Sequence, residues 1–239
     1  NQLSLRTGIS SHLIPNVMDF ENPPQPLDDY ASDVRHALGI EADELMILQP
    51  TRVVKRKGIE HAIELVCRMG MKAKLVISHD AGDEGFDYQE RLKEYADFLK
   101  VDLIFASDII NEKRGRTGDG RKIYTLEDVY PHADLVTYPS TFEGFGNAFL
   151  EAVYFNKPLL INRYATFVQD IEPKGFDLIV MDGYLTRKTV SNVKAILETT
   201  ERRANMVKTN YGIASQHYSY AVLLRWLNIM LTNFFGADP

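Results

Sequence analysis

Residues 134–152 read DLVTYPSTFEGFGNAFLEA, and this stretch indicates the fold class. Residues 134–138 form a short apolar run typical of a buried strand, and helical spacing begins near Gly146. Between them, two glycines flank Phe145, where the missing Cβ atoms would let the backbone approach a ligand and present its amide groups. A strand, a glycine-containing loop and a helix in this order predict one unit of an α/β domain with an anion-binding turn.

The same alternation of short apolar runs and amphipathic segments extends over most of the chain. Helical stripes cover residues 59–67 and 88–99, and after Thr186 the pattern is nearly all helical. The expected strands are residues 45–49, 73–78, 101–106, 134–138, 158–161 and 178–181. The alternation predicts an α/β fold with a Rossmann-like parallel sheet of about six strands and helices on both faces.

The composition limits the class of protein. With 239 residues, of which 45% are hydrophobic, the chain can bury the core of one large domain or two small ones. A net charge of -6 gives no overall basic surface for nucleic acid. The single cysteine, Cys67, cannot form an intramolecular disulfide, which favours a reducing compartment with the cytoplasm as the default. No apolar run is long enough for a membrane span, so we expect no transmembrane role.

The loop after residues 45–49 carries four cations, directly before an expected helix. A helix N-terminus favours anions through its free amide groups and its dipole, so this loop suits a diphosphate. Arg52 lies near the strand end and Lys57 near the helix start, and these two side chains can converge on a ligand. Lys55 and Arg56 are interpreted as a solvated charge run.

Two acidic residues belong to the glycine loop and the helix that follows it. Glu143 and Glu151 are eight positions apart, and at about 1.5 Å per residue the helix would separate them by roughly 12 Å. A retaining glycosidase needs carboxyl groups about 5–5.5 Å apart, so we expect these two to bind different parts of one long ligand.

The nicotinamide fingerprint G-x-G-x-x-G does not follow the first expected strand, and no Asp-x-Asp or zinc-finger spacing occurs. The sequence therefore predicts neither a nicotinamide site nor a metal site.

These motifs together resemble the C-terminal, donor-binding domain of retaining glycosyltransferases of family four (glycosyl transferases group 1), which have the GT-B fold. The matching elements are Ile14-Pro15-Asn16 with Asp19, Arg52 with Lys57-Gly58, Tyr130 through Asp134, Pro139-Ser140, and Glu143-Gly144-Phe145-Gly146 through Glu151-Ala152. One such motif carries little weight, but several in order make a chance match rare. The resemblance implies one nucleotide-sugar-binding domain over residues 1–239, with an N-terminal strand and connector in residues 1–40 and C-terminal helices in residues 187–239.

The resemblance also implies roles for single residues. Arg52 and Lys57 would neutralise the donor diphosphate, and Glu151 would hold the ribose hydroxyls. Glu143 would face the donor sugar and, with the two cations, serve catalysis. The distal phosphate and the sugar hydroxyls would be bound by the backbone of Gly144, Phe145, Gly146 and Asn147. The base-binding segment corresponds to residues 107–110, and the donor would be a UDP-, GDP- or ADP-sugar with no further cofactor.

Three features depart from the family pattern. Val17 replaces a glycine expected after Asn16, and Arg163-Tyr164 stands where many members have small glycines. Residues 111–122 form a basic, glycine-rich insertion, interpreted either as a solvated or mobile loop or as a flap that faces an anion. Among the six scattered histidines, His79 is of interest because it directly follows an expected strand.

The expected function is transfer of a glycosyl group from a nucleotide sugar to an acceptor with retention of configuration. The resemblance implies an N-terminal acceptor domain that residues 1–239 lack, so this chain alone is expected to bind donor but to transfer poorly. Two alternatives stay open, namely a non-catalytic nucleotide-binding domain and a sugar-nucleotide epimerase of the same fold. The expected location is the cytoplasm, with peripheral membrane association of the longer protein left open.

Overall fold

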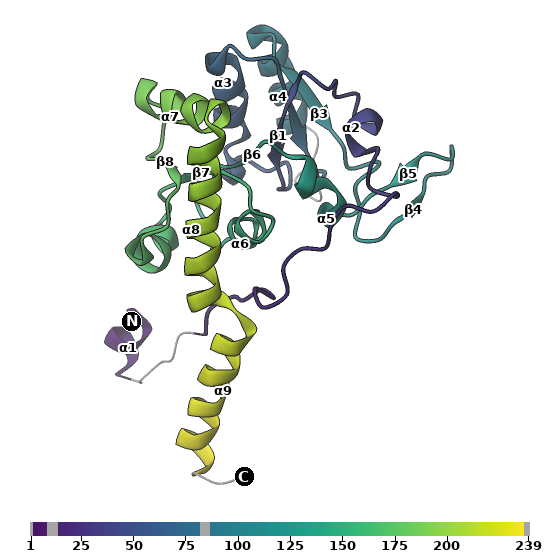
Figure 1. The fold of residues 1–239 in the computed structure, drawn as a ribbon. Helices are drawn as coiled ribbons and strands as arrows, with labels where there is room; N and C mark the ends of the chain where they lie inside the picture. The colour runs from purple at the N-terminus through teal and green to yellow at the C-terminus, as the bar shows by residue number, and fades with distance from the viewer. Residues whose placement is uncertain (1, 9–13, 82–86, 237–239) are drawn as a thin grey trace.

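Six parallel strands form one sheet in the order β3-β2-β1-β6-β7-β8 (Figure 1). The structure is a computed structural model that describes residues 2–8, 14–81 and 87–236. The strands of the sheet are β1 (Leu45–Gln49), β2 (Ala73–Ile77), β3 (Asp102–Phe105), β6 (Leu135–Tyr138), β7 (Leu159–Asn162) and β8 (Ile179–Met181). All six were expected from the sequence, and the predicted α/β fold class is confirmed.

The strand order reverses between β1 and β6, which are neighbours in the sheet although β2 and β3 separate them in the chain. Their register pairs Ile47 with Leu135 and Leu48 with Val136. In open parallel sheets, ligands bind beyond the carboxyl ends of the strands at such a switch point. We therefore expect the loops that follow β1 and β6 to form a functional site.

Helices cover both faces of the sheet because successive strand side chains point in opposite directions. In β1, Met46 and Leu48 face one core and Ile47 faces the other. The first core also contains side chains of α2 (Val34–Ala37), α5 (Leu126–Val129), α6 (Asn147–Tyr154) and the end of α8 (Thr200–Tyr218). The second core contains side chains of α3 (Ile59–Met69), α4 (Asp87–Leu99) and α7 (Arg187–Glu198).

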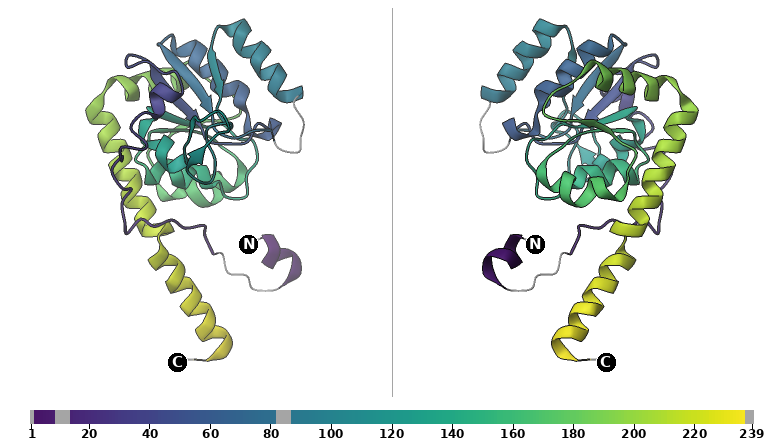
Figure 2. Two further views of the ribbon diagram at one scale, coloured as in Figure 1. Left: turned by 90° about the vertical axis from the view of Figure 1, so that its right-hand side faces the viewer. Right: turned by 90° about the vertical axis from the view of Figure 1, so that its left-hand side faces the viewer.

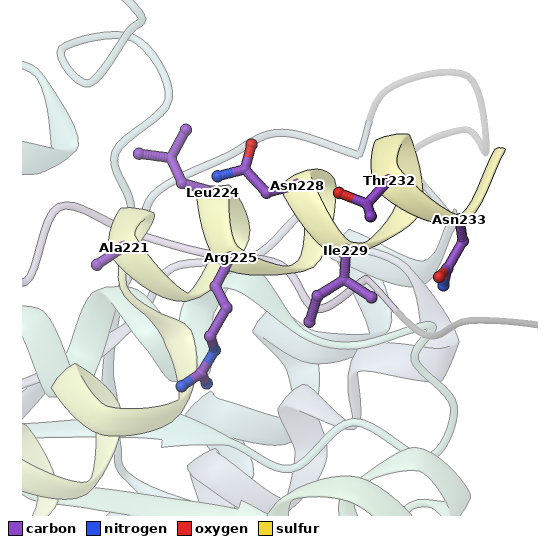
Figure 3. Close-up of a pocket in the computed structure, with 7 residues that line it drawn as sticks. All are labelled: Ala221, Leu224, Arg225, Asn228, Ile229, Thr232 and Asn233. Atoms are coloured by element: carbon purple, nitrogen blue, oxygen red, sulfur yellow. The ribbon is translucent and has the colours of Figure 1, made fainter. Parts of the chain in front are cut away.

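The C-terminal helix α9 (Tyr220–Phe235) extends beyond the sheet and its covering helices (Figures 1 and 2). Val222 is its single buried residue, while Phe235 is 82% exposed. A shallow depression on α9 is lined by described residues of this helix alone, and their side chains point away from the helix axis (Figure 3). Within the described part of the chain, no helix is both long and apolar enough to cross a membrane.

The N-terminal strand expected in residues 1–40 is not found among the residues that the structure describes there. The segment 14–19 contains no strand, and Met18 makes a single bridge to Ser219; Pro15 has no N–H to donate to a ladder. His12 and Leu13, which precede Ile14 and Pro15 in a short apolar run of the sequence, lie outside the described residues. The helical spacing over residues 28–38 yields the four-residue helix α2, because Asp28 and Ser32 bond locally to the backbone and favour turns. A further short helix, α1 (Gln2–Thr7), precedes this region.

The basic insertion at residues 111–122 contains regular secondary structure, and two of its cations are paired with carboxylates outside it. It contains an antiparallel hairpin of β4 (Gly115–Arg116) and β5 (Lys122–Ile123). Arg114 pairs with Asp28 and Asp128, and Lys122 pairs with Asp33. These cations are turned toward carboxylates of the connector and α5, so they attach the hairpin to the domain instead of presenting charge to a ligand.

Candidate functional site

The loops after β1 and β6 are joined directly at the switch point. The loop after β1 ends in a 3-10 turn (Lys55–Lys57) and Gly58, whose φ is +60°. A Cβ at Gly58 would lie 2.6 Å from the carbonyl oxygen of Pro139, so glycine is required for this close approach. The backbone N–H of Thr141 donates to the carbonyl of Arg56 at 2.8 Å. The two loops therefore form one unit.

A carboxylate between two cations lies at this junction. Lys57 Nζ is 2.5 Å from Glu143 Oε1, and Arg56 Nη1 is 3.1 Å from Glu143 Oε2. The Glu143 side chain is 9% exposed and that of Lys57 is 11% exposed. Burial is the largest single effect on the pKa of Glu143 and raises it, but the hydrogen bonds from Lys57, Ser140 and Tyr138 and the positive charge of Lys57 together outweigh burial, so the pKa is lowered. Burial lowers the pKa of Lys57, while Glu143 opposes that change. The junction thus holds a charged, nearly buried ion pair.

Gly146 is held by two tyrosines. Its φ is +106°, and a Cβ there would lie 2.7 Å from Tyr164 Oη and 2.9 Å from Tyr138 Cε1. Tyr164 Oη donates to the carbonyl oxygen of Phe145 at 2.6 Å, which fixes the loop in front of α6. Gly144 differs, since a Cβ at Gly144 would meet no atom within 4 Å. The protein itself therefore requires glycine at position 146, whereas position 144 borders open space.

The side chains of Phe145 and Asn147 make contacts within the protein, so these residues can offer a ligand mainly their backbone. The ring of Phe145 packs against Phe149 and Tyr218, so this side chain belongs to the core. Asn147 begins α6, and its Oδ1 accepts a hydrogen bond from Asn16 Nδ2 at 2.6 Å. This contact brings the Ile14-Pro15-Asn16 segment to the glycine loop. The loop precedes a helix N-terminus, which suits an anion or hydroxyl groups.

A cavity of about 780 Å³ opens at the carboxyl ends of the strands. Arg52 contributes to it from the loop after β1, and Glu151 from α6. The expected base-binding segment reaches the same wall through Ser107 and Ile110. A space of this size and position is typical of a small-molecule or cofactor site.

Within this cavity, Tyr130 orients Glu151. The Tyr130 hydroxyl donates to Glu151 Oε2 at 2.7 Å, and the Tyr130 ring is fully buried and stacks on Phe155. Burial raises the pKa of Glu151, and the hydrogen bond from Tyr130 opposes this rise. Glu151 is consequently a firmly held acceptor that faces a cavity and protonates more readily than an ordinary glutamate.

His79 and Asp80 also line the cavity, directly after β2. His79 Nδ1 lies 2.7 Å from Ser78 Oγ. Burial lowers the pKa of His79, Asp80 opposes this change, and the positive charges of Arg52 and Lys57 lower the pKa further. The ion pair at the loop junction is thus within electrostatic reach of the cavity wall.

The unusual pair after β7 has two separate structural roles. Arg163 pairs with Glu172 and Asp182, and Tyr164 supports the glycine loop as described above.

Among the described residues, no three His, Cys, Asp or Glu side chains are grouped so that they could hold a metal ion.

The sequence-predicted site residues fall into two adjoining parts of the switch point. Arg52 and Glu151 line the cavity, while Lys57 and Glu143 form the ion pair beside the glycine loop. The interpretation of Arg56 as a solvated charge is wrong, because its side chain contacts Glu143. Sequence reasoning also missed the orienting roles of Tyr130 and Tyr164. Tyr130 opens one of the matched motifs, which was the available signal for it.

Comparisons with known proteins agree with this geometry. Residues 120–212 match the family model described as glycosyl transferases group 1. The mannosylglucosylglycerate synthase of Petrotoga mobilis is 36% identical over 74% of this chain and 45% of its own length. The enzyme of the same name from Thermotoga maritima is 30% identical over 91% of this chain and 56% of its own length. The chain thus spans about half the length of these curated relatives.

A solved structure shows the same fold. Anabaena Alr3699/HepE, crystallised with UDP and glucose, superposes with a TM-score of 0.72 at 18% identity, over 92% of this chain and 56% of that one. The family match spans β6, the glycine loop, α6, β7 and β8, which build one side of the switch-point site. The chain therefore belongs to the group 1 glycosyl transferases, as a C-terminal glycosyltransferase domain of the GT-B fold.

Proposed function

We propose that this chain binds the nucleotide-sugar donor of a retaining glycosyltransferase at its switch point. The observation that carries the proposal is the joined pair of loops, which places Arg52, Lys57, Glu143 and the glycine loop beside a cavity that Glu151 lines. In this proposal the nucleoside occupies the cavity, with its ribose hydroxyls on Glu151. The diphosphate lies at Arg52, Lys57 and the backbone amides of the glycine loop, and the sugar lies near Glu143.

The chemical task of such a site is to stabilise a leaving group. As the anomeric bond breaks, negative charge grows on the departing diphosphate. Fixed cations and backbone amides that are already oriented toward this charge bind the transition state more tightly than the ground state. Arg52 and Lys57 supply the charge, and the N-terminus of α6 supplies the oriented amides.

We assign Glu143 to positioning and electrostatics, not to covalent catalysis. Both of its carboxylate oxygens have cationic partners, Lys57 on one and Arg56 on the other. A carboxylate held in this way is a poor nucleophile but a well-fixed hydrogen-bond acceptor. Retention would then follow from attack on the face from which the diphosphate departs.

The acceptor is proposed to bind largely outside this chain, because the curated relatives are about twice as long. Their names point to sugar transfer onto a glycosylated glycerate, and a hexosyl donor follows as part of the proposal. The single cysteine, Cys67, favours a reducing location such as the cytoplasm.

Nucleotide binding tests the proposal directly. Calorimetric titration with UDP, GDP and ADP should reveal one preferred nucleotide. Glu151→Ala should weaken its binding roughly ten- to a hundredfold, because a charge-assisted hydrogen bond contributes about 1.5–3 kcal/mol. Glu198→Ala is the matched control, since Glu198 is an exposed glutamate at the end of α7. Binding of none of the three nucleotides would contradict the proposal.

Product analysis separates transfer from the two alternatives. Incubation of a nucleotide sugar with this protein and no acceptor should leave the sugar configuration unchanged, whereas an epimerase would convert it. A non-catalytic domain would bind the nucleotide, yet the longer protein that contains it would release no nucleoside diphosphate in the presence of acceptors.

The binding should also depend on pH through Glu151. Because burial raises its pKa, affinity should fall as the pH drops through that pKa, where the carboxylate becomes protonated. Tyr130→Phe removes a donor to the charged form, so the fall should begin at higher pH. Titration between pH 5 and 8 checks this, with Glu151→Gln as the reference for other titrating groups, including the phosphates. An identical profile in wild type and Glu151→Gln would rule out this role of Glu151.

A further inference from the structure

Arg56 is attached to the loop after β6 at several points. Its carbonyl oxygen accepts from the backbone N–H of Thr141 at 2.8 Å and from the Thr141 hydroxyl at 3.2 Å. Its guanidinium donates to the carbonyl of Phe142 at 3.2 Å and to Glu143 Oε2 at 3.1 Å. The side chain is 39% exposed, yet backbone and guanidinium both hold the segment that carries Glu143.

We propose that Arg56 is a positioning residue of the donor site, which holds Glu143 so that Lys57 can bind the donor diphosphate. This inference rests on the proposed function, and it adds a residue outside the set that the family resemblance assigns. Arg56 acts through Glu143 and is not expected to contact the phosphates.

The side chain of Glu143 is almost completely buried. A nearly buried carboxylate needs a charged or hydrogen-bonding partner, and removal of its partner is costly. With Lys57 as the sole cationic partner, Glu143 would compete with the diphosphate for that ammonium group and would repel the phosphate charge. With Arg56 on its second oxygen, Glu143 stays paired while Lys57 shares its three N–H donors with the ligand.

A double-mutant cycle tests this indirect role. UDP, GDP and ADP are each titrated against wild type, Arg56→Ala, Glu143→Gln and the double variant, and the preferred nucleotide is used for comparison. Arg56→Ala should weaken its binding about tenfold, whereas in the Glu143→Gln background the same change should alter binding less than about twofold. Lys55→Ala removes an equal charge from the same turn, and its effect should also stay below about twofold.

Two results would overturn the inference. An equal loss in both backgrounds would mean that Arg56 contacts the phosphates directly. A loss no larger than that of Lys55→Ala would mean that Arg56 contributes surface charge alone. In Arg56 one nitrogen, Nη1, bonds both the Phe142 carbonyl and Glu143. Arg56→Lys keeps the charge but loses the planar guanidinium geometry, so its binding should fall between wild type and Arg56→Ala. Thermal melting confirms that each variant is folded.

A measurement without ligand separates this inference from the proposed function. Carboxyl-carbon NMR of the free protein, with the Glu143 signal identified by its loss in Glu143→Gln, follows the titration of that carboxylate. Besides Arg56, the groups around it are Lys57, Tyr138 and Tyr164. Arg56→Ala should move the midpoint upward by about 0.5 pH unit, because the charged form loses a partner. If the titration midpoint of Glu143 is unchanged in Arg56→Ala, the inference is overturned even if nucleotides bind. If the midpoint shifts but no nucleotide binds, only the proposed ligand role is overturned.

Discussion

Gly146→Ala should lower the stability of this domain by about 3 kcal/mol, which combines strain at a positive φ with overpacking of a closed site. The added methyl group would lie 2.7 Å from Tyr164 Oη and 2.9 Å from Tyr138 Cε1. Neither ring can easily withdraw, because both tyrosines are 2% exposed and Tyr164 is hydrogen-bonded to the carbonyl of Phe145. For a domain of this size, the melting temperature should fall by about 6–12 °C, measured by calorimetry or circular dichroism.

Gly144→Ala is the matched control, two positions away in the same loop. A Cβ at Gly144 meets no atom within 4 Å, so the melting temperature should stay within about 2 °C of wild type. Nucleotide-sugar binding should nevertheless weaken if the ligand approaches this backbone as proposed. Equal melting of the two variants would show that the tyrosines do not constrain position 146.

Lys57→Met should weaken nucleoside diphosphate binding roughly ten- to a hundredfold. Lys57 Nζ lies 5.4 Å from the centroid of the Tyr138 ring. Methionine keeps an apolar stem next to this ring, but the substitution removes the positive charge. A charge-assisted hydrogen bond to phosphate contributes about 1.5–3 kcal/mol, and its loss appears directly in the calorimetric dissociation constant. In an assay of the proposed glycosyl transfer, the rate should fall at least as far, because charge on the leaving group is greatest in the transition state.

Loss of Lys57 also leaves Glu143 with one cation in a nearly buried place, so Lys57→Met should destabilise the fold by about 1–3 kcal/mol. Combination with Glu143→Gln should restore the melting temperature without restoring nucleotide binding. Recovery of both together would mean that Lys57 serves stability and not the diphosphate, and the role assigned to it would be wrong.

In the loop after β1, the sequence pattern predicted the role of Arg56 incorrectly. Residues 55–57 are three consecutive cations, and position relative to the strand and helix predicted a ligand role for Lys57 and a solvated one for Arg56. The structure pairs both with Glu143, because the loop after β6 folds back onto this turn. Arg56 and Glu143 are 87 positions apart, and no local pattern encodes a contact over that separation.

The contacts of the hairpin at residues 115–123 also depend on residues that are distant in the sequence. Its glycines and cations suggested exposure, yet Arg114 and Lys122 find carboxylates on the connector and on α5. Charge content alone cannot distinguish a solvated cation from one paired with a distant aspartate. Similarly, the carboxylate at position 151 was assigned from a motif, but its orientation depends on Tyr130 from a different helical segment.

By itself, the sequence determined the α/β class, the positions of the six sheet strands and the two loops that meet at the switch point. Strand and helix periodicity and the backbone preferences of glycine are local properties, so they can be read along the chain. The tertiary structure alone decided which cations pair with Glu143, which tyrosines hold Gly146 and Glu151, and how the basic hairpin is attached. These contacts join side chains from distant segments, and they exist only after burial brings those segments together.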